Sequence, residues 1–210
     1  MIIYKILNYI LLNIKFNTVS KSKSKSKSKP NQTLNLNDAQ IDIIKDNKFQ
    51  ISKQALCVIA CAGSGKTTTI INKVLYMIKN LNCNPEEFIL TTFTRNAAEE
   101  MSQRIKSQSN DINLDAITIG TFHSIALKQI IEFNYQIEES KPESMPEEYL
   151  IKYLDLLNDP QYICPFKYIF IDEYQDINEL QYLIIKKWFD QCKILVVVGD
   201  DQQNIYTFRF

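Results

Sequence analysis

Histidine is almost absent from this chain of 210 residues, and its cysteines form no recognisable pair. The single histidine is His123, and no two of the five cysteines are spaced as C-x-x-C. The cysteines are Cys57, Cys61, Cys83, Cys164 and Cys192. This pattern predicts neither a zinc site nor a disulfide framework, and it favours reduced thiols in an intracellular protein.

A long uninterrupted apolar run is also missing. The most apolar stretch is MIIYKILNYILLNIKF, residues 1–16, and Lys5, Asn8 and Asn13 interrupt it. A helix that spans a bilayer needs about 20 apolar residues, and a secretory signal needs a basic start and a small-residue cleavage site. The segment therefore carries no strong membrane signal. Its apolar spacing leaves open an amphipathic helix beside the alternative of a dispensable extension.

No excess of one charge exists over the whole chain, because 24 basic residues balance 24 acidic ones. Seven of the lysines lie in residues 1–30, which hold no acid, so the remainder is mildly acidic. Bulk charge therefore does not indicate a nucleic-acid partner. The repeat SKSKSKSKSKP, residues 20–30, has no apolar surface to bury and is expected to be a disordered linker. Contact with phosphates or an import signal is the alternative reading of its lysines. We therefore divide the chain into an extension and linker, 1–32, and one domain, 33–210.

Apolar runs and helical periodicities alternate along this domain. Strands are expected at 56–60, 88–92, 116–119, 168–171 and 194–198. Helices are expected at 67–79, 95–107, 122–133, 147–157 and 177–189, with an acidic loop over 137–150. Strands that are apolar throughout are typical of a parallel sheet covered on both faces. The pattern predicts an α/β domain of three layers with a mainly parallel sheet.

The stretch ALCVIACAGSGKTTTI has the order strand, glycine loop, helix. Gly63 and Gly65 permit a tight turn and a close approach of the backbone to phosphate. The start of the following helix points amide N–H groups at an anion. Lys66 is expected to reach the β- and γ-phosphates of ATP and Thr67 to ligate Mg²⁺. The strict P-loop pattern would have glycine at position 60, where this chain has alanine.

The stretch KYIFIDEYQD places two carboxylates at the end of an apolar strand. The carboxyl ends of parallel strands gather at one edge of a sheet, where ligands bind. We therefore expect Asp172 beside the phosphate loop as a Mg²⁺ partner. Glu173 is expected to orient or deprotonate the attacking water. A solvated acidic turn is the alternative reading of this pair.

Six segments together resemble the superfamily 1 helicases of the UvrD/Rep type. The segments are LNDAQ (36–40), ACAGSGKTT (60–68), TTFTRNAAEEMSQRI (91–105), GTFHSIAL (120–127), DEYQD (172–176) and VGDDQQNIYTFRF (198–210). In that family alanine is usual at the position of Ala60, whereas glycine is more common at the position of Cys61. The resemblance covers residues 34–210 and implies a P-loop NTPase domain of the RecA-like fold.

The resemblance also implies roles for single residues. Gln40 matches the amide that recognises adenine, and Gln203 matches the glutamine that senses the γ-phosphate. The nucleotide-binding residues are Gln40, Ala62, Gly63, Ser64, Gly65, Lys66, Thr67 and Thr68, and the catalytic residues are Glu173, Lys66 and Gln203. The residues that match contacts to single-stranded DNA are Phe93, Thr121, Phe122, His123, Tyr206, Phe208 and Arg209. Aromatic rings can stack on any base, but Phe93, Phe122 and Phe208 are also open to a plain core role, and His123 to a structural one.

Some features depart from the family pattern. Arg95-Asn96 stands where the family has Asn-Lys, and only 48 residues separate His123 from Asp172, so the subdomain usually inserted there is tiny or missing. The family also has a second motor domain that supplies an arginine finger, whereas the three arginines here, Arg95, Arg104 and Arg209, all fall in motifs of the first domain.

We therefore expect the ATP-binding half of an ATP-dependent DNA helicase, with the second motor domain absent or supplied by a separate chain. Mg²⁺-ATP is the expected cofactor and single-stranded DNA the expected partner. The isolated chain should bind Mg²⁺-ATP, hydrolyse it slowly and not unwind DNA. The alternative is a catalytically weak, nucleotide-dependent interaction module, while a small-molecule kinase does not explain DEYQD together with TFHS.

Overall fold

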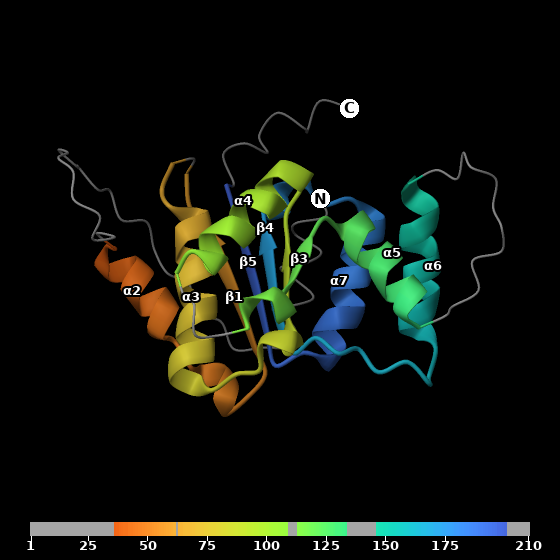
Figure 1. Cartoon of the computed structure of the whole chain (residues 1–210), viewed down its shortest axis with the longest axis horizontal. Helices are drawn as coiled ribbons and strands as arrows, with labels where there is room; N and C mark the ends of the chain where they lie inside the picture. Colours follow the sequence, from red (N-terminus) through yellow and green to blue (C-terminus); the bar gives the residue numbers. More distant parts are fainter. Residues whose placement is uncertain (1–35, 62, 109–112, 134–145, 201–210) are drawn as a thin grey trace.

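The computed structural model describes residues 36–61, 63–108, 113–133 and 146–200, which form strands and helices in alternation (Figure 1). The strands are β1 (Gln54–Ile59), β2 (Phe88–Thr91), β3 (Thr118–Gly120), β4 (Tyr168–Asp172) and β5 (Ile194–Gly199). The helices are α2 (Asp38–Lys45), α3 (Lys66–Leu81), α4 (Arg95–Lys106), α5 (Phe122–Glu132), α6 (Pro146–Asn158) and α7 (Glu179–Gln191). Within the described residues, no helix is both long and apolar enough to cross a bilayer.

The five strands form one parallel sheet with the order β1-β5-β4-β2-β3. β5, the last strand among the described residues, lies between β1 and β4, and it pairs with both along almost its whole length. β4 and β5 are buried at every residue because strands and helices surround them on all sides. The central position of β5 brings the ends of β1 and β4 to either side of its own end.

Helices cover both faces of the sheet, so the domain has the three predicted layers (Figure 1). On one face, α2, α3 and α4 bury a cluster that includes Ile71, Val74 and Met101. On the other face, α5, α6 and α7 bury a cluster that includes Leu150 and Trp188. The predicted α/β fold with a parallel sheet is confirmed, and it is the RecA-like P-loop fold.

The predicted elements are all present, with shifts at their ends. The largest correction concerns the loop expected over 137–150, because α6 begins at Pro146. Proline is favoured in the first turn of a helix, where its missing N–H costs nothing, and Glu147 and Glu148 follow it in that turn. Their negative charges suit the positive end of the helix dipole. The proline and acidic residues that indicated a loop are thus also typical of the first turn of a helix. α2 adds a helix that only its LNDAQ motif had marked.

Candidate nucleotide site

The glycine loop between β1 and α3 adopts the backbone conformation that its sequence predicts. Gly63 and Gly65 have φ angles of 73° and 83°, in the left-handed region where side chains are strained. Gly65 is the residue before the first turn of α3, so Lys66 and Thr67 begin the helix. The free N–H groups of that turn, together with the helix dipole, make its start a favourable place for an anion.

Two side-chain contacts join the start of α3 to the end of β4. Lys66 Nζ lies 3.5 Å from Glu173 Oε2, and Thr67 Oγ1 donates a hydrogen bond of 3.0 Å to Asp172 Oδ2. The Lys66 side chain is 7% exposed and that of Glu173 is 38% exposed. The four predicted residues, separated by about a hundred positions in sequence, therefore form one cluster of opposite charges and oxygen ligands.

Burial raises the pKa of Asp172. The residue is 9% exposed at the end of β4, and loss of hydration shifts the pKa of its carboxyl above the ordinary value. The hydrogen bond from Thr67 acts in the opposite direction, because it stabilises the charged form. Among the described residues, no group of three or more His, Cys, Asp or Glu side chains forms a metal cage by itself. The Thr67 hydroxyl and the Asp172 carboxylate are nevertheless both oxygen ligands of the kind Mg²⁺ takes beside phosphates.

Gln40, the predicted adenine-binding residue, lies next to the phosphate loop. It is in the first turn of α2, where Asn37 and Gln40 form a reciprocal capping box of two 2.9 Å hydrogen bonds. Its Nε2 also donates a hydrogen bond of 3.2 Å to the carbonyl oxygen of Ser64. One amide therefore fixes the start of α2 and touches the loop that is expected to hold the phosphates.

Gln175 contributes a link that the sequence analysis did not assign. Its Nε2 donates a 2.6 Å hydrogen bond to Glu173 Oε2, and its Oε1 accepts a 3.1 Å bond from the backbone N–H of Asp200. Glu173 has a φ of 53°, so its backbone is in the left-handed region. The Gln175 amide thus connects the end of β4 to the residue that follows β5. Its place in the DEYQD motif was the signal that pointed to it.

The end of β5 leaves no room for a side chain at Gly199. A Cβ atom there would overlap Gln175 Oε1 and the ring of Tyr174. Tyr174 is 2% exposed, so its ring has no open space to move into. Gly199 therefore permits the close approach of β5 to the short helical turn Tyr174–Asp176.

The four described residues expected to contact DNA differ in their exposure. Phe93 is 61% exposed, whereas Phe122 is 6% exposed and stacks on Trp188 with 5.5 Å between ring centroids. Thr121 accepts a hydrogen bond from the N–H of Ser124 and so caps α5. His123 is half-buried. The assignment of these residues to DNA stays a prediction, and Phe122 has a packing role besides.

A small cavity is lined both by residues expected to contact DNA and by the two carboxylates expected to act in ATP hydrolysis. It has a volume of about 120 Å³ and is lined by Phe93, Thr121, Phe122 and His123 together with Asp172 and Glu173. A larger open hollow of about 810 Å³ lies beside it, between α4 and α5, with Arg95 and His123 in its wall. The four described residues expected to touch DNA therefore lie next to Asp172 and Glu173.

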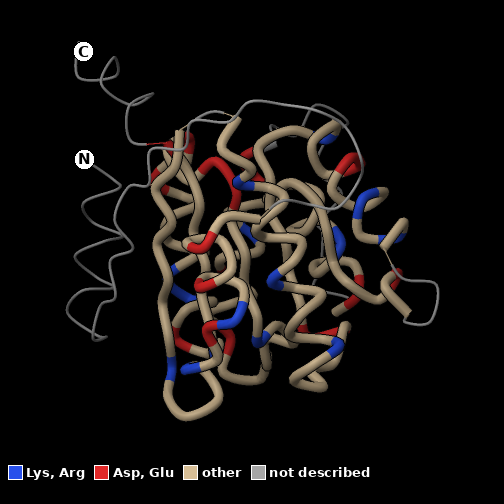
Figure 2. The backbone as a smooth tube through the Cα atoms, turned by 90° about the vertical axis from the view of Figure 1, so that its left-hand side faces the viewer, with Lys and Arg blue, Asp and Glu red and all other residues tan. Residues whose placement is uncertain are grey.

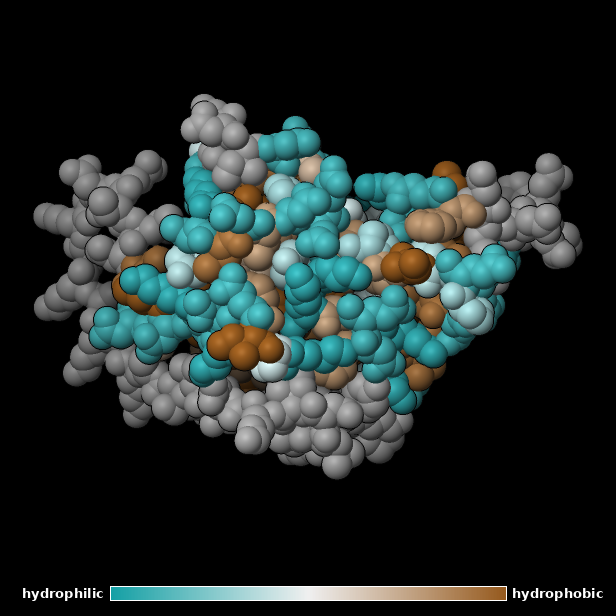
Figure 3. Space-filling model, turned by 90° about the horizontal axis from the view of Figure 1, so that it is seen from below, coloured by the Kyte–Doolittle hydropathy of each residue, from teal (hydrophilic) through white to brown (hydrophobic). Residues whose placement is uncertain are grey.

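The charge distribution agrees with the sequence analysis. Basic and acidic positions are intermingled along the backbone rather than separated onto opposite faces (Figure 2). The described part of the face seen from below is mainly hydrophilic, with separate hydrophobic residues (Figure 3). None of the five cysteines, which all lie among the described residues, forms a disulfide. Ala62, Gln203, Tyr206, Phe208 and Arg209 lie outside the described residues, and their predicted roles stay predictions.

Comparison with known proteins gives a consistent result. The family described as "UvrD/REP helicase N-terminal domain" matches residues 36–158 and 146–210. The relative named ATP-dependent DNA helicase Rep, from Buchnera aphidicola subsp. Schizaphis graminum, is 24% identical over 78% of this chain and 37% of its own length. The ATP-dependent DNA helicase PcrA of Leuconostoc citreum is 26% identical over 76% of this chain and 32% of its length. The ATP-dependent DNA helicase SRS2 of Saccharomyces cerevisiae is 35% identical over 50% of this chain and 9% of its own length. The chain thus spans less than two fifths of each of these relatives.

Proposed function

Because the chain belongs to the UvrD/REP helicase family, we propose that residues 36–210 bind Mg²⁺-ATP and hydrolyse it as the ATP-binding part of a DNA helicase. The observation that carries the proposal is the cluster of Lys66, Thr67, Asp172 and Glu173 at the start of α3. These are the side chains that phosphoryl transfer requires in a P-loop enzyme: a cation, a metal-binding hydroxyl and two carboxylates.

Each residue has a separate task in this proposal. Lys66 neutralises the β- and γ-phosphates, and Thr67 and Asp172 hold the Mg²⁺ ion, which would balance charge on the phosphate oxygens. Glu173 accepts a proton from the attacking water. Gln40 recognises adenine beside Ser64, and Gln203 senses the γ-phosphate. Among the described arginines, Arg104 pairs with Glu100 and Arg95 lines the open hollow. We therefore propose that an arginine finger comes from a second motor domain, on this polypeptide or on a separate chain.

Single-stranded DNA is the proposed partner. The exposed ring of Phe93 suits stacking on a base, which is worth about 1–3 kcal/mol in other proteins. Thr121 and His123 share a cavity with Phe93 and with both carboxylates. A strand held there would be close enough to affect the hydrolytic residues. An intracellular location is proposed from the cysteine spacing in the sequence, which predicts no disulfide framework.

The test is a binding and turnover experiment on the full chain with Mg²⁺-ATP, with and without an oligothymidine strand. We expect micromolar ATP binding that Lys66→Met weakens, together with slow hydrolysis that the strand and an added second motor domain stimulate. The exposed Lys106→Met variant, at the end of α4, is the control. If the chain binds ATP but does not hydrolyse it even with the second motor domain added, the result would support an interaction module instead. If it does not bind ATP at all, the proposal is wrong.

A further inference from the structure

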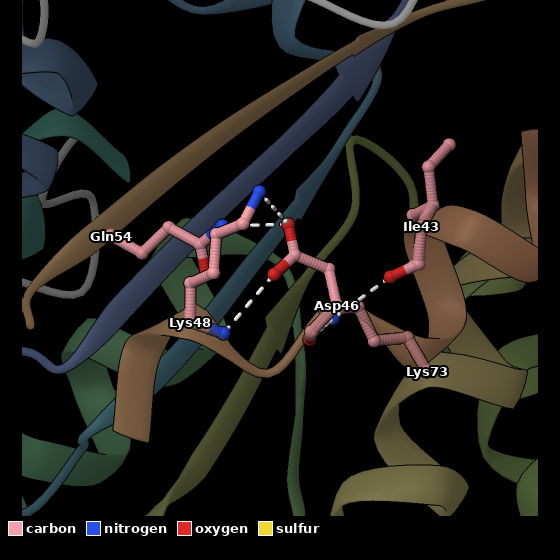
Figure 4. A network of polar contacts seen from close by, with 5 residues as sticks. All are labelled: Ile43, Asp46, Lys48, Gln54 and Lys73. Carbon is pink, nitrogen blue, oxygen red and sulfur yellow. Dashed lines mark hydrogen bonds and ion pairs between the residues drawn. The ribbon is translucent and has the colours of Figure 1, made fainter. Parts of the chain in front are cut away.

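A buried lysine connects α2 to α3 on the face of the sheet that carries the nucleotide loop. Lys73 is 1% exposed, in the middle of α3. Its Nζ donates hydrogen bonds of 2.9 Å to the carbonyl oxygen of Ile43 and 2.7 Å to that of Asp46 (Figure 4). A buried amine is costly unless it is hydrogen-bonded, so these two bonds give Lys73 a defined partner on the neighbouring helix.

The two carbonyl groups belong to the end of α2. The last carbonyls of a helix have no partner inside the helix, and a cation suits the negative end of the helix dipole. Lys73 supplies both a hydrogen-bond donor and this charge. The end of α2 is therefore held by α3, the helix whose first turn carries Lys66 and Thr67.

Asp46 extends the connection to β1. Its Oδ2 accepts a hydrogen bond of 3.0 Å from Gln54 Nε2, and its Oδ1 accepts one of 3.1 Å from the N–H of Lys48. Gln54 is the first residue of β1. The end of α2 is thus tied to both elements that flank the phosphate loop, one through the Asp46 carbonyl and the other through its carboxylate.

The opposite end of α2 carries Gln40. This helix has only eight residues and so is about 12 Å long at 1.5 Å per residue. A displacement at its end therefore shifts its start, because a short helix moves as a rigid unit. Gln40 Nε2 touches Ser64 O at 3.2 Å from that start. The position of the amide over the loop depends on both ends of the helix.

We infer that Lys73 is a positioning residue for nucleotide selectivity: by holding the end of α2, it sets where Gln40 presents its amide to the base. The inference rests on the proposed function of Gln40. Recognition of the base and binding of the phosphates should respond differently to a change at Lys73. Lys73 acts on the base through α2, and it makes no contact with the cluster expected to hold the phosphates. Selectivity for adenine should therefore depend on Lys73 more than affinity for phosphate does.

Lys53 offers a control that has the same hydrogen-bond pattern at an exposed position. Its Nζ also donates to two carbonyl oxygens at a helix end, those of Phe189 and Asp190 in α7, both at 2.8 Å. That helix end lies on the other face of the sheet from α2. Lys53→Met and Lys73→Met thus remove the same kind of interaction from two different helices.

The experiment measures the affinity of the full-length wild type, Lys73→Met, Lys73→Arg and Lys53→Met for ATP, GTP and tripolyphosphate with Mg²⁺. We expect Lys73→Met to lower the preference for ATP over GTP by about tenfold, the scale of one hydrogen bond. Its affinity for tripolyphosphate should stay within about twofold of wild type. Lys53→Met should keep the wild-type preference for ATP over GTP and the wild-type affinity for tripolyphosphate. Lys73→Arg keeps the charge and the donors, so its preference for ATP over GTP should lie between those of the wild type and Lys73→Met.

Two results would overturn the inference. One is a folded Lys73→Met variant with the wild-type preference for ATP, and the other is an equal loss of all three ligands. Should circular dichroism show that Lys73→Met does not fold, an unchanged preference in Lys73→Arg would count against the inference in the same way. A wild type that binds neither ATP nor tripolyphosphate would instead refute the proposed function itself, and with it this inference.

Discussion

Lys66 Nζ and Glu173 Oε2 lie 3.5 Å apart, so the cation of the phosphate loop and the proposed general base form an ion pair across the nucleotide site. The γ-phosphate of ATP needs the same cation. Glu173 and the phosphate would therefore compete for Lys66. The Gln175 amide provides a second partner for Glu173 at 2.6 Å, which holds the carboxylate in place when Lys66 turns to the phosphate.

Glu173→Gln should separate binding from hydrolysis. The substitution removes the proposed base, whose contribution in enzymes is typically about 10²–10⁴-fold in rate. ATP affinity should be unchanged or higher, because Lys66 loses its competing carboxylate. Phosphate release and nucleotide titration measure the two effects. The control is Glu86→Gln, an exposed position in the turn Pro85–Glu87. Full hydrolysis by Glu173→Gln would show that another group activates water.

Gly199→Ala should destabilise the domain more than Gly63→Ala does. The added methyl at Gly199 would overlap Gln175 and the buried Tyr174 ring, and overpacking of this kind costs about 1–3 kcal/mol. At Gly63 a methyl would meet no atom within 4 Å, so only the left-handed backbone is strained, at about 1 kcal/mol. Chemical denaturation of both variants gives the comparison. Equal or reversed losses would mean that β5 can move away from Gln175.

Phe93→Ala and Phe122→Ala should have opposite consequences. Phe93 is exposed, so its loss should leave the free energy of unfolding within about 0.5 kcal/mol of wild type and weaken binding of an oligothymidine strand by about 1–3 kcal/mol. Phe122 stacks on Trp188 in the core, so its loss should cost about 3–5 kcal/mol of stability. Fluorescence of Trp188 follows unfolding, and anisotropy of a labelled strand follows binding. Unchanged strand affinity in Phe93→Ala would remove this ring from the DNA path.

The pH dependence of the free energy of unfolding should reveal the lowered pKa of Lys73. Burial lowers the pKa of its amine from 10.5 to about 8, although the charges of Asp46 and Cys83 act in the opposite direction. Between these two pH values the unfolded chain binds the extra proton, so the free energy of unfolding should rise with pH. Below about pH 8 both states are protonated and this contribution is constant.

The measurement is the difference in unfolding free energy between wild type and Lys73→Met from pH 7 to pH 10. This difference should shift in favour of wild type above pH 8, by at most about 1.4 kcal/mol per pH unit. Subtraction removes the groups that titrate in both proteins, while Cys83 requires a parallel Cys83→Ala series because its pKa is coupled to Lys73. A flat difference would show that the amine keeps its ordinary pKa.

Two local motifs predicted the charged cluster of this site because each of them follows a strand. The loop after β1 and the carboxylates after β4 had to meet at one edge once the strands were parallel, and Lys66, Thr67, Asp172 and Glu173 do meet there. The strand order could not be read from the sequence, since it depends on pairing between distant segments. The place of β5 between β1 and β4 is therefore information that only the structure gives.

The side chains that the sequence left unassigned act through contacts between distant elements. Lys73 lies among Ile70, Val74 and Met77 at helical spacing, which marks it as a buried lysine but does not say what it touches. Its partners are backbone carbonyls 27 and 30 positions away, and carbonyl groups carry no sequence signature. In the same way Phe122 and Phe93 come from similar motifs, and only packing against Trp188 distinguishes the core ring from the exposed one.

The place of β5 also governs when the nucleotide site can form during synthesis. In the described residues β1 pairs only with β5, although 134 residues lie between Ile59, the end of β1, and Ile194, the start of β5. β1 therefore has no neighbouring strand until β5 has been made. Contacts between such distant segments slow folding. On the ribosome, Gly63 to Thr67 would therefore emerge long before the sheet that fixes them, and the phosphate loop would be among the last parts to become rigid. Protection of this loop from proteolysis should thus appear in nascent chains only after residues 194–199 have left the exit tunnel.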